Sequence, residues 1–133
     1  MTQVSCPCGA ATLTVSGEAI AQFYCHCGDC RQMLGGAYAL EAVYPADAVS
    51  VEGATIAFAL KRTPRVSCAA CGTRLYADLP SFNARGVNGT LLPGFKPAFH
   101  MHCREALAPV RDDLPHYAKM PAAFGGEDTL VDW

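Results

Sequence analysis

The sequence predicts a mainly β fold, and three features carry this prediction. Runs of β-branched and aromatic residues are short, as in 12–15 and 55–60, and small or polar residues alternate with them. The 12 glycines and 9 prolines are scattered through the 133 residues as turn markers. The eight cysteines occur mostly in close pairs, a spacing typical of metal binding. We therefore expect a single zinc-binding domain over residues 1–133.

The first third of the chain predicts two strands and a short helix. Residues 12–15 and 19–24 have the alternation of strands, and the turn at 16–18 between them favours a hairpin. Residues 29–34 can form one short helical turn. The glycine pair at 35–36 is expected to end it, because glycine tolerates the left-handed conformation of a helix end.

Short strands are expected through the rest of the chain as well. They comprise residues 37–44, 55–60, 65–67, 74–77, 86–91 and 98–103, with a connecting turn at 45–49. The third and fourth of these form the two arms of a hairpin, with Cys68 and Cys71 between them. From Pro109 onward, Pro115 and Pro121 predict an irregular tail that packs along the surface.

The composition argues against two classes of partner. The formal net charge is −2 and no run of Lys or Arg stands out, so we expect no binding to nucleic acid or to an anionic membrane surface. No apolar run approaches the roughly 20 residues of a membrane-spanning helix, and residues 1–6 do not start a signal peptide, so a cytoplasmic location is expected. In that reducing compartment, eight cysteines indicate metal binding or catalysis more than disulfides.

Two pairs of cysteines predict a closed structural zinc site. Cys68 and Cys71 have the Cys-x-x-Cys spacing with which a tight turn presents two thiolates to one ion. Cys6 and Cys8 form a less common half-site, stiffened by Pro7. The four together complete a tetrahedron, whose binding free energy of about 10–16 kcal/mol would stabilise a small core. The alternative of buried cysteines or a disulfide explains the paired spacings less well.

The middle cysteines predict a different kind of site. Cys25, Cys27 and Cys30 supply three thiolates and no fourth, which favours a zinc ion with an open position that can activate a bound thiol or water. These three cysteines are therefore the candidate catalytic ligands. One alternative is a closed second structural site with a fourth ligand from His26, His100, His102 or Cys103. Another alternative is an inert cluster without metal.

The histidines carry a weaker signal than the cysteines. His26 is expected to point away from the cysteines that flank it on an extended backbone. His100 and His102 fall on one face of an expected strand and Cys103 on the other, because side chains alternate along a strand. Two histidines so placed can form half of a metal site. The plainer interpretation is that they are hydrogen-bonded sheet histidines and that Cys103 is a small buried residue.

In order and spacing, these motifs resemble the glutathione-dependent formaldehyde-activating enzyme family, which also includes centromere protein V. The residues that carry the resemblance are Cys6-x-Cys8-Gly9, Cys25-His26-Cys27-x-x-Cys30-Arg31, Cys68-x-x-Cys71-Gly72-Thr73, Gly35, Gly89-Thr90-Leu91, a histidine near position 100 and Asp112-Asp113-Leu114-Pro115. The resemblance implies a β-tent of small antiparallel sheets. It also implies two zinc ions, a structural one on Cys6, Cys8, Cys68 and Cys71 and a second, which can be partly occupied, on Cys25, Cys27 and Cys30.

The resemblance implies an activity too. The family adds glutathione to formaldehyde to give S-hydroxymethylglutathione, formally a carbon–sulfur lyase reaction in reverse, so the expected partner is a small thiol or thiol adduct. Arg31, Arg74 or residues 61–65 could hold a glutathione carboxylate, and Glu41 and Asp78 are candidate acid–base groups. Two other functions stay open at this stage, a non-catalytic zinc-stabilised binding module and a redox-sensing cysteine cluster.

Overall fold

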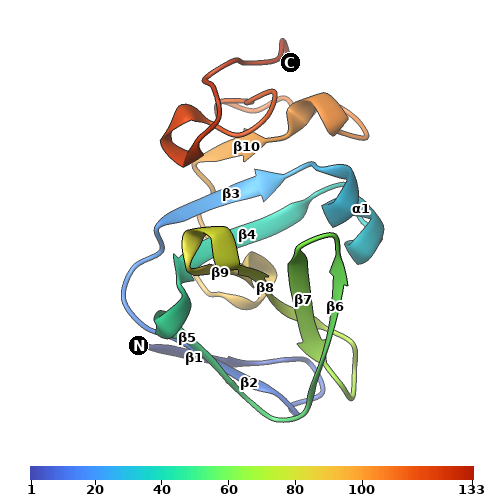
Figure 1. The fold of residues 1–133 in the computed structure, drawn as a ribbon, viewed down its shortest axis with the longest axis vertical. Coiled ribbons are helices and arrows are strands. Elements are labelled where there is room, and N and C mark those ends of the chain that lie inside the picture. Colours follow the sequence, from blue (N-terminus) through green and yellow to red (C-terminus); the bar gives the residue numbers. More distant parts are fainter. The chain divides into compact units, whose positions relative to one another are not determined.

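The computed structural model describes all residues 1–133 and confirms a mainly β protein with a single short α-helix. Its elements are β1 (Thr2–Ser5), β2 (Thr12–Val15), β3 (Ala21–Cys25), α1 (Gly28–Leu34), β4 (Ala39–Pro45), β5 (Val49–Glu52), β6 (Thr55–Leu60), β7 (Thr63–Cys68), β8 (Arg74–Leu79), β9 (Ala84–Asn88) and β10 (Phe99–Met101) (Figure 1). None of the helices has the length and apolar character that crossing a bilayer requires.

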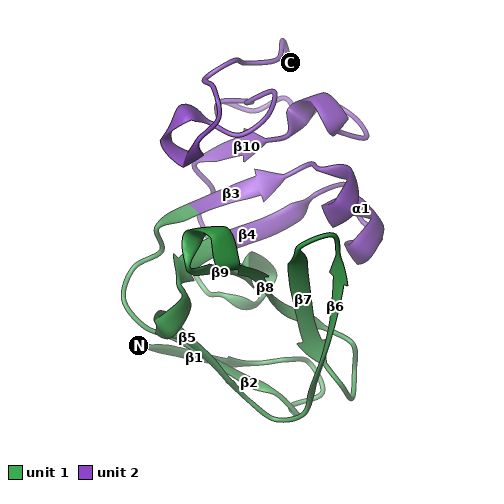
Figure 2. Ribbon diagram, in the orientation of Figure 1, with its two compact units in different colours: residues 1–21, 42–95 green, residues 22–41, 96–133 purple.

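The chain forms two compact units. Unit 1 comprises Met1–Ala21 and Ala42–Phe95, and unit 2 comprises Gln22–Glu41 and Lys96–Trp133 (Figure 2). Strand β4 begins in unit 2 and ends in unit 1. The expectation that the chain acts as one domain stays a prediction.

Unit 1 is built from two groups of strands. Strands β1, β2 and β5 form a three-stranded antiparallel sheet, and β9, β8, β7 and β6 pair antiparallel in that order. Leu13 and Val15 of β2 both point into the core, as the period of two along a strand requires. The buried residues around them are Ala42, Val49, Val87 and Leu92. A second buried group joins Cys6 and Cys68 to Ala11 and Leu75, so these two cysteines are part of the core.

The predicted hairpin of residues 12–15 and 19–24 is wrong. Strand β2 pairs with β1 and β5, whereas β3 lies between β10 and β4. Gly17 does form a turn, with φ +71°, but the chain on either side of it bonds elsewhere. The N–H of Ser16 donates to Ala48, and that of Ile20 donates to Val43. Bonds to distant residues therefore outweigh the local pairing that the alternation suggested.

Several other element boundaries differ from the prediction. Residues 2–5 and 49–52 form strands that were not expected. The strand expected over 86–91 is wrong beyond Asn88, because the Asn88 side chain accepts the N–H of Thr90 and starts a 3₁₀ turn. The strand expected over 98–103 ends at Met101, since His102 adopts a positive φ of 55°.

Unit 2 holds β10, β3 and the start of β4 side by side, with β10 parallel to β3 (Figure 1). Helix α1 follows β3 after only two residues and ends where Gly35 adopts φ +71°, as predicted. The tail is mostly irregular, as expected, but isolated bridges hold it in place. His116 pairs with His100, and Tyr117 pairs with Leu130.

Candidate metal centres

The structure brings Cys6, Cys8, Cys68 and Cys71 together in unit 1, with all four sulfurs within 4.8 Å of one another. The Sγ atoms of Cys6 and Cys8 are 3.5 Å apart, and those of Cys8 and Cys68 are 3.8 Å apart. A tetrahedral zinc site with bonds of about 2.3 Å has sulfurs about 3.8 Å apart, whereas a disulfide has a length of about 2.05 Å. All eight cysteines are free. The spacing of the sulfurs therefore fits a zinc ion and not a disulfide.

The two loops that carry these cysteines have the same backbone form. The N–H of Gly9 donates to the carbonyl of Cys6 at 2.9 Å, and the N–H of Gly72 donates to Cys68 at 2.8 Å. The two glycines have φ of +78° and +77°, a conformation that other residues rarely adopt. Each loop therefore turns tightly enough to present two thiols on one side.

Two thiols of this group favour the ionised form that a zinc ligand needs. The Thr73 hydroxyl, which lies 3.1 Å from the sulfur of Cys71, lowers the pKa of Cys71 to about 6. A backbone hydrogen bond from Ala11 lowers the pKa of Cys6 below its usual value. A backbone hydrogen bond lowers the pKa of Cys8, but hydrogen bonds with Cys6 and Cys71 outweigh it and raise that pKa to about 12. This thiol would therefore have to lose its proton when a cation binds.

Cys25, Cys27 and Cys30 form the second group, in unit 2, where the turn from β3 to α1 positions them. The Sγ atoms of Cys25 and Cys30 are 3.6 Å apart, close to the edge of a zinc–sulfur tetrahedron. Cys27 caps the helix, because its sulfur accepts the N–H of Cys30 at 3.3 Å. No other histidine, cysteine or acidic residue joins this group, which therefore offers three potential ligands and no fourth.

One thiol of the second group ionises far more readily than the others. Hydrogen bonds from Cys25 and Cys30, together with the backbone N–H of Cys30, lower the pKa of Cys27 to about 2. The same contact with Cys27 raises the pKa of Cys25 well above its usual value. The group therefore carries one negative charge before any cation binds.

Two charged side chains flank the start of α1 next to this group. The N–H of Gly28 donates to Oε1 of Glu105 at 3.1 Å, and Oε2 of Glu105 lies 3.6 Å from Nδ1 of His102. Arg31 donates from Nε to the carbonyl of His26 at 3.3 Å. A Cβ placed on Gly28 would lie 3.5 Å from Glu105 and 3.7 Å from Nη2 of Arg31. Because Gly28 has no side chain, the carboxylate of Glu105 and the guanidinium of Arg31 can both lie close to the start of α1.

The other residues selected from the sequence lie in different places. Glu41 is buried in unit 2, close enough to Cys30 for its charge to raise the pKa of that thiol. Cys103 is buried outside both cysteine groups, and burial raises its pKa to about 12. The candidates that lie in unit 1 are Arg74, Asp78 and residues 61–65, and Asp78 pairs with Arg85 at 3.5 Å. Glu105 was not predicted from the sequence as a site residue, because no local sequence pattern marks it.

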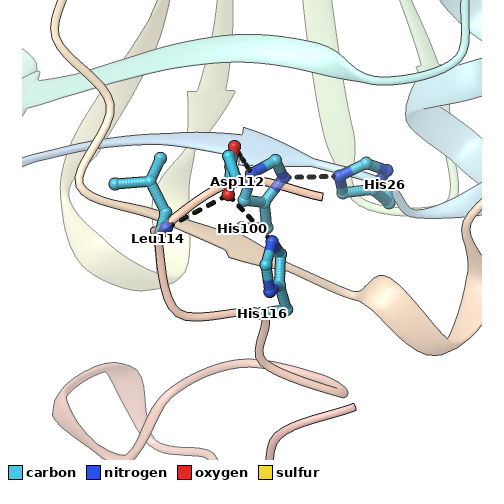
Figure 3. Close-up of polar contacts among 5 residues, drawn as sticks. All are labelled: His26, His100, Asp112, Leu114 and His116. Atoms are coloured by element: carbon cyan, nitrogen blue, oxygen red, sulfur yellow. Dashed lines mark hydrogen bonds and ion pairs between the residues drawn. The ribbon is translucent and has the colours of Figure 1, made fainter. Parts of the chain in front are cut away.

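The histidines form a hydrogen-bonded chain in unit 2 (Figure 3). Nε2 of His26 lies 2.9 Å from Nδ1 of His100, and Nε2 of His100 lies 2.7 Å from Oδ2 of Asp112. Nε2 of His116 lies 2.9 Å from Oδ1 of the same carboxylate. His26 points toward His100 and is not in the cysteine group, as expected. His100 is not grouped with His102, whose positive φ takes it out of the strand.

Burial and hydrogen bonding set the charge states of the side chains in this histidine network. Loss of solvent lowers the pKa of His26 to about 4 and also lowers that of His100. Burial alone would raise the pKa of Asp112, but hydrogen bonds from His100, the N–H of Leu114 and His116 outweigh it and hold that pKa below its usual value. His26 and His100 are therefore neutral and Asp112 ionised at pH 7. His116 was missed in the sequence, which shows no periodic pattern around it.

Comparison with known proteins relates the chain to a protein family. The family profile described as glutathione-dependent formaldehyde-activating enzyme matches residues 1–105, which include all eight cysteines. Asp112 and His116 lie outside the matched range. No curated protein matches the chain significantly. A crystal structure of a Rhodobacter sphaeroides protein from a structural genomics programme has a similar fold, with a TM-score of 0.55 and 23% sequence identity over 72% of this chain and 92% of that chain.

The matched range covers most of the chain and confirms the resemblance drawn from the cysteine motifs. The chain therefore belongs to the glutathione-dependent formaldehyde-activating enzyme family.

Proposed function

We propose that the chain is a zinc-dependent enzyme of the carbon–sulfur lyase type, acting on a small thiol adduct such as S-hydroxymethylglutathione. Cys25, Cys27 and Cys30 hold the reactive zinc. Cys6, Cys8, Cys68 and Cys71 would hold a structural zinc. The observation that carries the proposal is the group of three sulfurs with no fourth protein ligand, in a chain that belongs to this family.

Zinc held by these three cysteines would supply Lewis acidity and would stabilise the thiolate form of a bound thiol. The start of α1 holds Cys27 and Cys30 at fixed spacing, so the open position is shaped before the substrate arrives. Forming the adduct makes one carbon–sulfur bond, and the thiol proton ends on the former carbonyl oxygen. Glu41 and Glu105 are our candidates to hold that proton in transit.

Arg31 is our candidate for binding a glutathione carboxylate. Its guanidinium lies beside Gly28 at the start of α1, directly after Cys27. A guanidinium can donate two parallel hydrogen bonds to a carboxylate, which orients the ligand as well as binding it. Arg31→Lys is expected to raise KM for the glutathione adduct while kcat changes less, because the charge stays and the paired donors are lost.

Two further parts of the proposal follow from the same chemistry. Thiolate ligands need reducing conditions, so a cytoplasmic location is proposed with the activity. The two zinc ions are proposed to serve one functional domain over residues 1–133.

The test measures exchange of formaldehyde between its free form and S-hydroxymethylglutathione by NMR. The zinc-loaded protein is expected to speed this exchange above the protein-free rate, and Cys27→Ser to return it to that rate. The matched control is Cys103→Ala, which removes a buried cysteine outside both groups and is expected to keep the acceleration.

Metal analysis of the same samples separates the alternatives. Two zinc ions per wild-type chain and no acceleration would overturn the proposed activity. One zinc per chain, unchanged in Cys27→Ser, would favour a non-catalytic binding module held together by the four-cysteine site alone.

A further inference from the structure

A third group of potential ligands lies outside the two cysteine groups. One ligand atom from each of His100, Asp112 and His116 lies within 4.8 Å of the others. The imidazole rings of the two histidines have centroids 4.7 Å apart. Neither cysteine group includes any of these residues, so the proposed enzyme activity leaves them without an assigned role.

We propose that His100, Asp112 and His116 form a third metal site, which takes a divalent first-row transition ion, with zinc as the reference case. Nε2 of each histidine and the carboxylate of Asp112 would be its ligands. Two imidazoles and one carboxylate are a donor set that such ions accept, with further positions left for water or a substrate.

The backbone holds these ligands in place without a metal. His100 and His116 are directly paired in a parallel bridge, where the N–H of His100 donates to Pro115 and the N–H of Tyr117 donates to His100, both at 2.9 Å. Side chains of paired residues lie on the same face of a sheet. Asp112 is fixed by its own turn, since its Oδ1 accepts the N–H of Leu114 at 3.1 Å (Figure 3).

The separations of the ligand atoms suit an ion with little rearrangement. The two nitrogen–oxygen distances are 2.7 and 2.9 Å. An ion with bonds of about 2.1 Å has neighbouring ligands about 3.0 Å apart in an octahedron and about 3.4 Å apart in a tetrahedron. Each nitrogen–oxygen pair would therefore need to separate by about 0.1–0.3 Å for an octahedral ion and by about 0.5–0.7 Å for a tetrahedral one.

The second ring nitrogen of His100 also has a partner. Its second nitrogen, Nδ1, lies 2.9 Å from Nε2 of His26, and such a partner commonly fixes the ring of a ligand. His100 is fully buried, and the ring of Trp133 lies 4.9 Å from that of His116. An aromatic cover of this kind limits access of water to a bound ion.

Metal binding would reverse the hydrogen bond between the two buried histidines. In the present network, ionised Asp112 accepts a hydrogen bond from Nε2–H of His100, so Nδ1 of His100 accepts a hydrogen bond from Nε2–H of His26. An ion on Nε2 of His100 requires the proton to sit on Nδ1 instead. The tautomers of His100 and His26 therefore report occupancy of this site and are separate from any signal of the cysteine groups.

The experiment titrates zinc into protein whose cysteine sites are already loaded and follows the ring nitrogens by ¹⁵N NMR. We expect His100 to change from the Nε2–H to the Nδ1–H form, with one further zinc bound per chain. His116→Gln removes the imidazole ligand, and Asp112→Asn keeps a hydrogen-bond acceptor but removes the charge. Neither variant should bind the additional zinc ion.

His102→Asn is the matched control, because it removes a neighbouring histidine and asparagine tolerates the positive φ of position 102. It should bind as much zinc as the wild type. An unchanged tautomer of His100 in the wild type at saturating zinc would overturn the proposal even if a variant failed to fold. Equal zinc content in the wild type and Asp112→Asn would overturn it as well.

Discussion

His26 and His100 are joined by a hydrogen bond of 2.9 Å between two side chains that are almost fully buried. The bond connects β10 to the residue that lies between Cys25 and Cys27. Asp112 extends the connection, because it bonds to His100 and to His116 in the tail. A single network of polar side chains therefore ties the tail to the strand-to-helix turn that carries the second cysteine group.

Replacing His100 with leucine should destabilise the protein. The substitution leaves Nε2 of His26 buried without a partner and removes one of the hydrogen bonds to Asp112, so we expect the free energy of unfolding to fall by about 2–4 kcal/mol. Urea unfolding followed by circular dichroism measures the change. His102→Asn should alter it by less than about 0.5 kcal/mol. A loss below about 1 kcal/mol in His100→Leu would show that the network adds little to stability.

The stability of the protein should also depend on pH through His26. Burial lowers its pKa in the folded state from 6.5 to about 4. Between these two values the unfolded chain binds a proton that the folded chain does not, so the free energy of unfolding falls as pH decreases from 6.5 to about 4. The contribution is fully present above pH 6.5.

NMR titration of the histidine rings checks this prediction directly. The ring of His26 should titrate near pH 4, and the pH dependence of stability should be weaker in His26→Phe, which cannot bind the proton. A midpoint close to 6.5 for His26 would contradict the prediction.

The two cysteine groups could be predicted from the sequence because the spacing of cysteines within each short loop determines how they are presented. A Cys-x-x-Cys or Cys-x-Cys segment presents two ligands through local backbone geometry, so only the pairing of the halves had to be inferred. Strand β6 was predicted with its observed limits, Thr55–Leu60, for a similar reason, since alternation is a local property. In each case neighbouring residues determine the structure.

The histidine network could not be predicted, because it depends on contacts between distant residues. His100 meets His116 only through a bridge between β10 and the tail, and His26 meets His100 across 74 positions in the chain. The error over residues 12–24 has the same origin. The local pattern indicated a hairpin, but β2 found its partners in β1 and β5.

Removal of the structural zinc should unfold the part of the core that surrounds it. Cys68 is completely buried and packs with Leu75, so a metal bound at the proposed site and the hydrophobic core would stabilise each other. We expect a chelator to lower the melting temperature strongly. For the wild type, free zinc at 100 times its Kd should add about 2.7 kcal/mol to the free energy of unfolding.

The stabilisation by zinc should be strongly reduced in Cys68→Ser and unchanged in Cys103→Ala. Both substitutions change a buried cysteine, but only Cys68 belongs to a group of four sulfurs. Thermal unfolding at several zinc concentrations measures the difference. A Cys68→Ser variant that responds to zinc like the wild type would argue against a structural metal at this site.

Gly53→Ala should weaken the same zinc site from a distance. Gly53 has φ +109°, and a Cβ there would collide with the carbonyl oxygen of Ala10. Ala10 donates its N–H to the sulfur of Cys8 at 3.4 Å, so a displaced Ala10 moves a ligand of the metal. Gly17→Ala is the matched control, because Gly17 also has a positive φ, +71°, but a Cβ there meets nothing within 4 Å.

The control shows the cost of a positive φ without the collision. Strain should cost Gly17→Ala about 1 kcal/mol, whereas Gly53→Ala combines the larger strain of φ +109° with the collision, so it should lose more stability and also affinity for zinc. Competition with a chromophoric chelator measures that affinity, and urea unfolding measures the stability. If the two variants bind zinc equally well, the contact between Gly53 and Ala10 does not position Cys8.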